Sequence, residues 1–508
     1  MMSKSGGYRR FLAALLLIAG SIGSGRAFGA QASGNNIGAV LPISPISASV
    51  LVARAVHTGL IQPQSAGRSS NAAPQLTCTP APCALPNVQA SGGGQPVNED
   101  PIAVNPKNAL QLLSGGNDYN CPNIQGFYSS GNGGTSWLST CLNNLSGQFG
   151  EGDPIVGYDR KGNSYIGGID SPNGSTGEIV FEKSSNNGAT WSAPSIAVNP
   201  FFSGGLTDKP WLQIDTTATS PHVNALYMSV TQFDVSSNST ITVSHSTNGG
   251  TTWSGAIQVD TTQIYPNVDQ FSDIAIGKDG TVYVSWMRCL ATGPTGDCGG
   301  TTAMMEVSKS TDGGNTWSLP VPIATPALAP DTCSAFYGCV PNSSERVSNV
   351  PAIGIDNSTG PNAGHLYVVM YTWTGVYLKV EVYRSSNGGA TWSLAGNVAP
   401  TSDTHDQFFP WLSVGSKGKV GVTWLDRRND PSNVSYEAFG TYSTNGGSTF
   451  KPNLQLATVA SNPNNDGFGG GFMGDYTGNT WTGITLYASW MDTRNGSTAQ
   501  DEVGGLLK

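Results

Sequence analysis

Arginine and aspartate recur at a fixed spacing in two separate segments of the chain. Residues 424–428 and 490–494 both read Trp-x-Asp-x-Arg, and a third arginine, Arg288, also closely follows a tryptophan. Guanidinium groups hold planar carboxylates through two parallel hydrogen bonds, which suits an acidic sugar. The pattern therefore predicts ligand-binding residues, namely Arg288, Arg428, Arg494, Asp426 and Asp492. The competing interpretation is that each aspartate pairs with the arginine two residues later and braces its own turn.

A second group of aspartates stands at or just before apolar segments that are typical of strands. One of them, Asp475, directly precedes Tyr476. Glycosidic bonds are cleaved by pairs of carboxylates or, in some enzymes, by a tyrosine nucleophile. We therefore expect catalytic candidates at Tyr476, Asp475 and Asp406. Further acidic ligand-binding positions are expected at Asp153 and Asp208, with Asp100 in the corresponding place of the first unit.

The structural units that position these residues are indicated by six near-copies of one short turn motif. The copies read SGNGGTSW (130–137), SNNGATW (185–191), STNGGTTW (246–253), STDGGNTW (310–317), SSNGGATW (385–392) and STNGGSTF (443–450). Their closing aromatic residues stand 54, 62, 64, 75 and 58 residues apart. Self-similarity at such a period indicates a solenoid, an array or a propeller.

The residue types of the motif predict a tight turn between two strands. Asn or Asp at the third position is expected to bind backbone amides two residues on, and the glycines supply positive φ. The closing aromatic side chain is expected to pack on a neighbouring sheet. The structural residues of the motif are Asn132, Asn186, Asn248, Asp312, Asn387 and Asn445, with Trp137, Trp191, Trp253, Trp317, Trp392 and Phe450.

The motif resembles the Asp-box, or BNR repeat, of the sialidase-superfamily β-propellers. The resemblance covers the chain from about Asp100 to its end. It implies that each box is the turn between the third and fourth strands of a blade, on the face away from the active site. Sialidases also carry Arg-Ile-Pro at the first innermost strand, whereas residues 99–102 read Glu-Asp-Pro-Ile here.

Each unit reads as four antiparallel strands, which is the composition of a propeller blade. Seven first halves can be counted, one more than the boxes, so we predict an all-β, single propeller of seven four-stranded blades. Six blades, as in true sialidases, is the alternative. The last unit lacks a fourth strand, and residues 85–90 are expected to supply it. Strands from both termini would then close the ring and remove an exposed sheet edge.

The N-terminal part of the chain divides into two predicted segments. Residues 1–32 form a predicted signal peptide, with basic residues, a short apolar run and a small-x-small cleavage site. Residues 33–97 are rich in Pro, Ser and Gly and read as a linker or arm, of which residues 37–61 are apolar enough to pack on the side of the propeller. Residues 98–508 form the propeller. The mature chain is expected to be secreted, periplasmic or on the cell surface.

Eight cysteines support an exported protein, because an even number in such a chain favours disulfides. They lie in close couples, which predicts sequential pairing rather than metal binding. The couples are Cys78 with Cys83, Cys121 with Cys141, Cys289 with Cys298, and Cys333 with Cys339.

Composition argues against a nucleic-acid partner. Charged residues make up 11% of the chain, against about 25% in an average soluble domain. The net charge of −9 becomes −13 once residues 1–32, with four basic and no acidic side chains, are removed. An acidic chain has no electrostatic reason to bind a polyanion. No membrane span is expected after signal removal, and we expect a monomer.

Two functions follow from the resemblance and the charged residues. The first is recognition of a glycan or an extracellular protein through the face lined by these Asp and Arg side chains, without turnover. The alternative is an exo-acting, sialidase-like glycoside hydrolase that cleaves acidic sugars with a tyrosine nucleophile. The missing Arg-Ile-Pro favours the first. No metal or cofactor is expected, although the Gly-rich loop at residues 464–474 offers Asp466 as an alternative calcium ligand.

Overall fold

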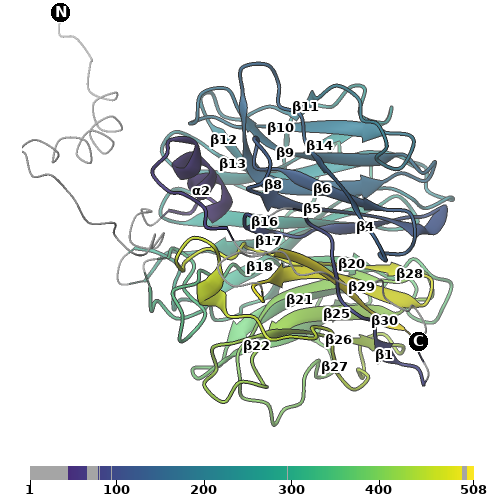
Figure 1. The fold of residues 1–508 in the computed structure, drawn as a ribbon. Helices are drawn as coiled ribbons and strands as arrows, with labels where there is room; N and C mark the ends of the chain where they lie inside the picture. The colour runs from purple at the N-terminus through teal and green to yellow at the C-terminus, as the bar shows by residue number, and fades with distance from the viewer. Residues whose placement is uncertain are drawn as a thin grey trace, which may run out of the picture. The chain divides into compact units, whose positions relative to one another are not determined.

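The computed structural model describes residues 44–65, 78, 80–92, 94–293, 296–333, 335–494 and 500–507. The predicted signal peptide lies outside these residues. The described chain contains one α-helix, α2 (Ala48–His57), one 3-10 helix, η2 (Pro463–Asn465), and thirty strands in seven antiparallel sheets (Figure 1).

The first three sheets contain thirteen strands. The first holds β3 (Val97–Asn98), β4 (Ile102–Asn105), β5 (Asn108–Asp118), β6 (Gly126–Ser130) and β7 (Leu138–Cys141). The second holds β8 (Phe149–Tyr158), β9 (Ser164–Ser171), β10 (Glu178–Ser184) and β11 (Ser195–Val198). The third holds β12 (Leu206–Ile214), β13 (Leu226–Phe233), β14 (Ser239–Ser246) and β15 (Ile257–Gln258).

The next three sheets repeat the same four-stranded order. The fourth holds β16 (Val268–Ile276), β17 (Val282–Cys289), β18 (Ala303–Ser310) and β19 (Val321–Ala324). The fifth holds β20 (Ala352–Ile355), β21 (Leu366–Trp373), β22 (Leu378–Ser385) and β23 (Ser393–Leu394). The sixth holds β24 (Gln407–Val414), β25 (Val420–Asp426), β26 (Glu437–Ser443) and β27 (Leu454–Gln455).

The seventh sheet joins strands from both ends of the described chain, as the sequence predicts. It holds β28 (Gly478–Thr482), β29 (Thr485–Asp492) and β30 (Gln500–Leu507), with β1 (Cys83–Ala84) and β2 (Val88–Gln89) pairing on the outer side of β30. Antiparallel pairs join Cys83 to Leu507 and Val88 to Val503. The predicted contribution of residues 85–90 is therefore confirmed, with the strands starting two residues earlier.

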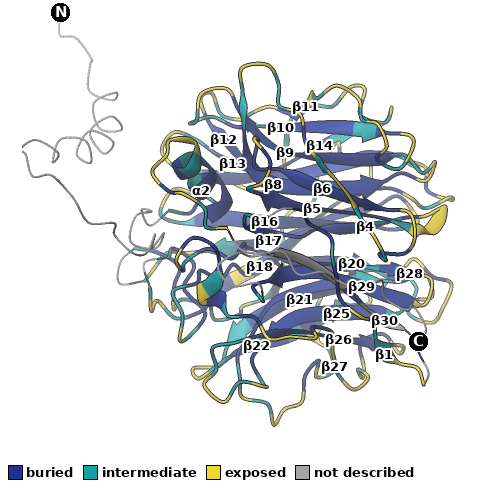
Figure 2. Cartoon of the chain, in the orientation of Figure 1, coloured by how far each residue is buried: buried dark blue, intermediate teal, exposed yellow. Residues whose placement is uncertain are grey.

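The first strands of the seven sheets contact one another in a closed series, β4–β8–β12–β16–β20–β24–β28–β4. This arrangement is a β-propeller, and the all-β prediction is confirmed. The seven sheets of the described chain match the seven units counted in the sequence. Because strands alternate in direction, the first strands begin at one end of the ring, here called the axial face, and the six boxes lie at the other, the box face. Figure 2 shows the strands buried and most connecting loops exposed.

Each of the six turn motifs connects the third and fourth strands of its sheet. In the box between β14 and β15, Ser246 Oγ donates to Asn248 Oδ1 (3.0 Å) and accepts from the amide of Gly250 (2.9 Å). Asn248 Oδ1 also accepts from the amide of Thr252 (3.0 Å). The side chain thus binds an amide four residues on, not two as predicted, because two consecutive residues with positive φ, here Gly249 and Gly250, widen the turn.

The same three bonds recur in the other five boxes. The second copy, predicted at residues 185–191, begins one residue earlier, at Ser184, whose hydroxyl donates to the side chain of Asn186. The aromatic residues pack between sheets, as predicted: the ring of Trp253 meets the ring of Phe181 in the neighbouring sheet edge to face, with centroids 5.4 Å apart.

Replacing a box serine is expected to destabilise the fold measurably. In Ser443→Ala, the buried hydroxyl that bonds Gly447 and Asn445 is lost, which leaves a buried amide without a partner and costs about 1–2 kcal/mol of unfolding free energy. Urea unfolding followed by tryptophan fluorescence measures the change. Exposed Ser432, whose substitution by alanine should stay within about 0.5 kcal/mol, is the control; equal effects would contradict the prediction.

Four disulfides pair the cysteines in sequence order, as predicted: Cys78 with Cys83, Cys121 with Cys141, Cys289 with Cys298, and Cys333 with Cys339. Within the described ranges, no helix is long and apolar enough to cross a bilayer.

Candidate functional site

Non-glycine residues with positive φ recur where the first strands begin. Glu99, Asp153, Lys209, Phe271 and Phe409 have φ between 45° and 64°. Four of these positions coincide with register shifts in β8, β12, β16 and β24, and Glu99 fills the break between β3 and β4. Such backbone conformations cost about 1–3 kcal/mol each and cluster at functional sites. The axial ends of the first strands are therefore the candidate location of a functional site.

Four carboxylates gather at this end of the ring, contributed by Glu99, Asp153, Asp208 and Asp475, and we call them the axial cluster. The amide of Asp475 donates to Glu99 Oε1 (3.1 Å), and the amide of Lys209 donates to Asp153 Oδ2 (2.9 Å). All four side chains are buried. Burial raises the pKa of Glu99 well above its ordinary value, and the nearby charge of Asp153 raises it further. Burial, together with Asp153, raises the pKa of Asp208 to about 7.

A buried lysine lies beside the axial cluster in a cage of aromatic rings. Lys209 Nζ is 4.2 Å from the ring centroid of Tyr476, 4.4 Å from that of Trp211 and 5.9 Å from that of Trp411. Burial lowers the pKa of Lys209, although Asp153 and other carboxylates oppose this shift. Among the described residues, neither Lys209 Nζ nor the Tyr476 hydroxyl has a hydrogen-bond partner. Unsatisfied buried polar atoms of this kind are rare in folded proteins.

One guanidinium reaches the axial cluster. Arg346 makes two hydrogen bonds to Asp475, from Nε (3.0 Å) and Nη2 (2.5 Å), and both side chains are buried. The ring of Tyr337 lies 5.2 Å from the guanidinium carbon. Since Asp475 already occupies the fork of Arg346, this arginine is not available for a second bidentate carboxylate.

Residues 44–57, here called the N-terminal cap, lie over the axial cluster. The amide of Ser47 donates to Asp208 Oδ2 (2.7 Å), and the hydroxyl of Ser49 donates to Asp153 Oδ1. The helix of the cap, α2, packs beside β8 (Figure 1), where Arg54 forms a bidentate ion pair with Glu151 at 2.7 and 2.8 Å. Residues 44–57 of the predicted packing segment 37–61 thus lie on the axial carboxylates rather than on the side of the ring.

The Gly-rich loop before β28 borders the cap. Phe468 and Phe472 pack in one apolar cluster with Val52 and Ala55 of α2. The Asp466 carboxylate accepts hydrogen bonds from three backbone amides of its own loop, at 2.9 to 3.1 Å. Among the residues that the structure describes, no group of three or more His, Cys, Asp or Glu side chains is placed to hold a metal ion.

The structure brings some predicted site residues together. Asp153, Asp208, Asp475 and Tyr476 meet in the axial cluster or its aromatic cage. Asp406 lies elsewhere: it accepts the amide of Leu378 (2.8 Å) and pairs with Arg427 (3.3 Å).

The three predicted arginines lie in, or two residues after, the second strands of three different sheets, and each already holds carboxylates of its own sheet or turn. Arg288 pairs with Asp269 (2.7 Å) and Glu306 (3.0 Å). Arg428 pairs with Asp426 (2.5 Å) and Asp403 (3.2 Å), and Arg494 with Asp492 (2.5 Å). Trp-x-Asp-x-Arg is thus a self-pairing turn in both of its copies.

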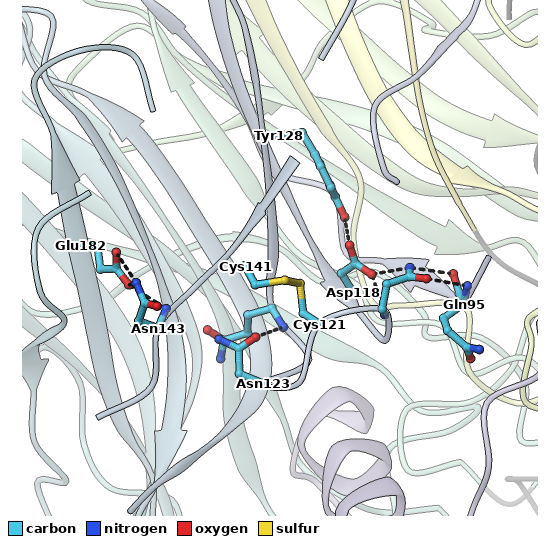
Figure 3. Close-up of a disulfide and its surroundings, with 10 residues drawn as sticks. Gln95, Asp118, Cys121, Asn123, Tyr128, Cys141, Asn143 and Glu182 are labelled. Carbon is cyan, nitrogen blue, oxygen red and sulfur yellow. Dashed lines mark hydrogen bonds between the residues drawn. A yellow bond between two sulfur atoms is a disulfide. The ribbon is translucent and has the colours of Figure 1, made fainter. Parts of the chain in front are cut away.

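The acidic residue after the second strand of the first sheet is also held locally. Asp118 accepts hydrogen bonds from the hydroxyl of Tyr128 (2.8 Å) and the side chain of Asn120 (2.6 Å), close to the Cys121–Cys141 disulfide (Figure 3). These contacts shape the connecting loop.

Sequence reasoning missed Glu99, Lys209 and Arg346 as site residues. A usable signal existed for Lys209, because Asp153-Pro154, Lys209-Pro210 and Phe409-Pro410 repeat one residue–proline step at the same point of three first strands. For Arg346 no local signal existed, since its partner Asp475 is 129 residues away in the chain.

A cavity of about 750 Å³ runs between the later parts of the first strands. Its lining includes Trp211, Trp411 and Asp273. Since Trp211 and Trp411 also form the cage of Lys209, these two rings lie between the cavity and the axial cluster. Asp273 accepts the amides of Ile353 and Ile274, both at 2.7 Å.

Stability is expected to fall as pH rises through neutrality. Burial raises the pKa of Asp273 to about 7, so its contribution is fully present below the unfolded-state pKa near 4 and is lost as pH rises through 7. For this group the loss between pH 5 and pH 8 is roughly 2–3 kcal/mol. Thermal unfolding at both pH values measures it, and Asp273→Asn should flatten the dependence. Exposed Asp279→Asn is the control and should leave the dependence unchanged.

No family model and no curated protein matches this sequence. Solved structures with a similar arrangement include a Hadza microbial sialidase (13% identity, TM-score 0.42). The match covers 81% of this chain and 66% of the sialidase chain. An intramolecular trans-sialidase from Ruminococcus gnavus (12% identity, TM-score 0.45) is covered to 96% by 70% of this chain. An alpha-L-arabinanase from Penicillium chrysogenum (12% identity, TM-score 0.44) is covered to 92% by 70% of this chain. Similarities this low do not bear on substrate or reaction.

Proposed function

We propose that the protein is a secreted propeller that binds a glycan at its axial face. The observation that carries the proposal is the axial cluster, where buried carboxylates stand beside the aromatic faces of Trp211, Trp411 and Tyr476 around the unsatisfied Lys209 Nζ. Sites for small ligands combine apolar and aromatic surface with a few fixed polar groups. The four disulfides agree with an oxidising compartment.

The charges at the site favour a neutral or amino sugar over an acidic one. Carboxylates accept hydrogen bonds from hydroxyl and ammonium groups, and an additional carboxylate from the ligand would be repelled. The guanidinium at the cluster is held by Asp475. The three arginines predicted for an acidic sugar are likewise paired.

A glycan array tests the proposal. It is probed with the intact protein and with Asp153→Asn/Asp208→Asn, and it carries neutral, amino and sialylated glycans. We expect saturable binding of neutral or amino glycans that falls at least tenfold in the variant, because two acceptors for ligand donors are weakened. No binding to any glycan, or equal binding by both proteins, would contradict the proposal.

A second candidate is glycoside hydrolysis, and the position of the buried Glu99 carboxyl beside Asp153 favours it. A carboxyl group whose pKa is raised by burial, beside a second carboxylate, is the arrangement of an acid–base pair. Tyr476, beside both, is the tyrosine to replace first. Chromogenic sialosides, uronides and neutral glycosides are the substrates to test. Turnover that falls about a hundredfold or more in Glu99→Gln and Tyr476→Phe would establish this function; absence of turnover with every substrate leaves recognition alone.

A further inference from the structure

We propose that the N-terminal cap is an autoinhibitory segment that occupies the ligand position of the axial site and must leave before a ligand binds. The inference rests on the proposed function, because it specifies how that same site is regulated. The reason for the proposal is that the cap donates hydrogen bonds to the same carboxylates that a sugar would use as acceptors.

The cap satisfies the axial cluster with the groups that a carbohydrate would offer. The hydroxyl of Ser49 stands in for a sugar hydroxyl on Asp153, and the amide of Ser47 stands in for a second donor on Asp208. A glycan donor needs the same carboxylate oxygens. The cap and a ligand are therefore mutually exclusive at Asp153 and Asp208.

Side chains of the ring also donate hydrogen bonds to the backbone of the cap. Pro45 carbonyl oxygen accepts from the hydroxyl of Tyr337 (2.7 Å) and from Gln270 Nε2 (3.3 Å). Ile46 carbonyl oxygen accepts from Arg346 Nη1 (3.0 Å). Buried polar groups that bind one dipeptide in this way form a site for a chain segment. Their contacts account for the cap holding its place without belonging to a sheet.

The cap is separable from the propeller, since none of the thirty strands comes from residues before Cys83 in the described chain. The ring closes through β1, β2 and β30 without it. The cap is held by its polar contacts, by the Arg54–Glu151 ion pair, by the buried side chain of Val50 and by packing on Phe468 and Phe472. Residues 58–60 directly after the helix are exposed, with Leu60 58% accessible, so a protease can reach the chain there.

The test opens the cap in the full chain. Ser49→Glu/Arg54→Glu places new carboxylates against Asp153 and Glu151, which repels the cap and leaves every ring residue unchanged. Hydrogen–deuterium exchange of residues 44–57 reports whether the cap has left. We expect rapid exchange there. A fluorescent synthetic peptide of residues 44–62 should bind saturably to the variant but not to the wild type. The affinity for a glycan should rise about tenfold or more, because the variant no longer populates the closed state that excludes the ligand.

The matched control is Arg160→Glu/Ser236→Glu, which makes the same charge changes at exposed positions outside the cap and should behave as the wild type. A second preparation carries a protease site between Gly59 and Leu60 and is cleaved after folding. A cap that stays protected from exchange in both preparations is a permanent part of the fold and overturns the proposal. Loss of the cooperative unfolding transition on opening also overturns it.

Two further outcomes separate this proposal from the proposed function. If the peptide binds the opened variant but no glycan competes with it, the cap occupies a site for a different ligand, and the glycan function fails while the cap's role stands. If a glycan binds wild type and opened variant equally and the peptide does not compete, glycan recognition stands and the autoinhibitory role is overturned.

Discussion

Truncation after Arg494 is expected to abolish the cooperative fold of the propeller. It removes β30, which lies between β29 on one side and β1 and β2 on the other. Without β30, β29 keeps β28 but loses its partner on the other side, and both N-terminal strands lose their sheet. An open ring also exposes a long edge strand, which promotes aggregation. We expect insoluble protein, or soluble protein without a sharp thermal transition.

The control is truncation after Leu507, which removes one residue and leaves the pairing of β30 intact. Its thermal transition should match that of the full chain. Calorimetry and size-exclusion chromatography compare the two proteins. A truncation after Arg494 that unfolds cooperatively near the wild-type temperature would show that the ring does not depend on this closure.

Arg346→Ala is expected to cost about 3–5 kcal/mol of unfolding free energy, because it leaves the Asp475 carboxylate buried without its partner. It also removes the hydrogen bond that Arg346 donates to the Ile46 carbonyl of the cap. Urea unfolding measures the loss. Asp475→Asn in the same chain should recover part of it, since the remaining side chain is neutral.

The control for Arg346 is a partly exposed ion pair. Lys379 pairs with Glu381 at 3.0 Å, and its side chain is 29% accessible. Lys379→Ala should cost no more than about 1 kcal/mol, because water screens such pairs. Similar losses in both variants would mean that burial of the Arg346–Asp475 pair carries no special energetic weight.

The fold was predictable because its signals are local. Each box places a serine, an asparagine or aspartate and a glycine within five residues, so one copy encodes its whole turn. Six copies at similar spacing then reveal the ring. The closing strand was predictable by counting, since the last unit lacked a partner that residues 85–90 could supply.

The candidate site was only partly predictable, because its contacts join distant parts of the chain. Asp153, Asp208 and Asp475 were recognisable from their position before strands. The aromatic cage of Lys209 was not, since Tyr476 meets it from another sheet. The arginines of Trp-x-Asp-x-Arg predicted an acidic ligand, but in the structure they pair with the aspartates of the same motif. A spacing that allows ligand binding also allows this internal pairing, and the sequence alone does not say which of them occurs.

The seventh sheet imposes an order on biogenesis. Its outer strands come from residues 83–89 and their partner from residues 500–507, so more than four hundred residues of polypeptide must emerge before the two meet. Contacts of such long sequence separation form late. During synthesis the nascent chain therefore stays unsealed until its last strand has emerged, which makes arrival of that strand the step that commits the molecule to its native topology.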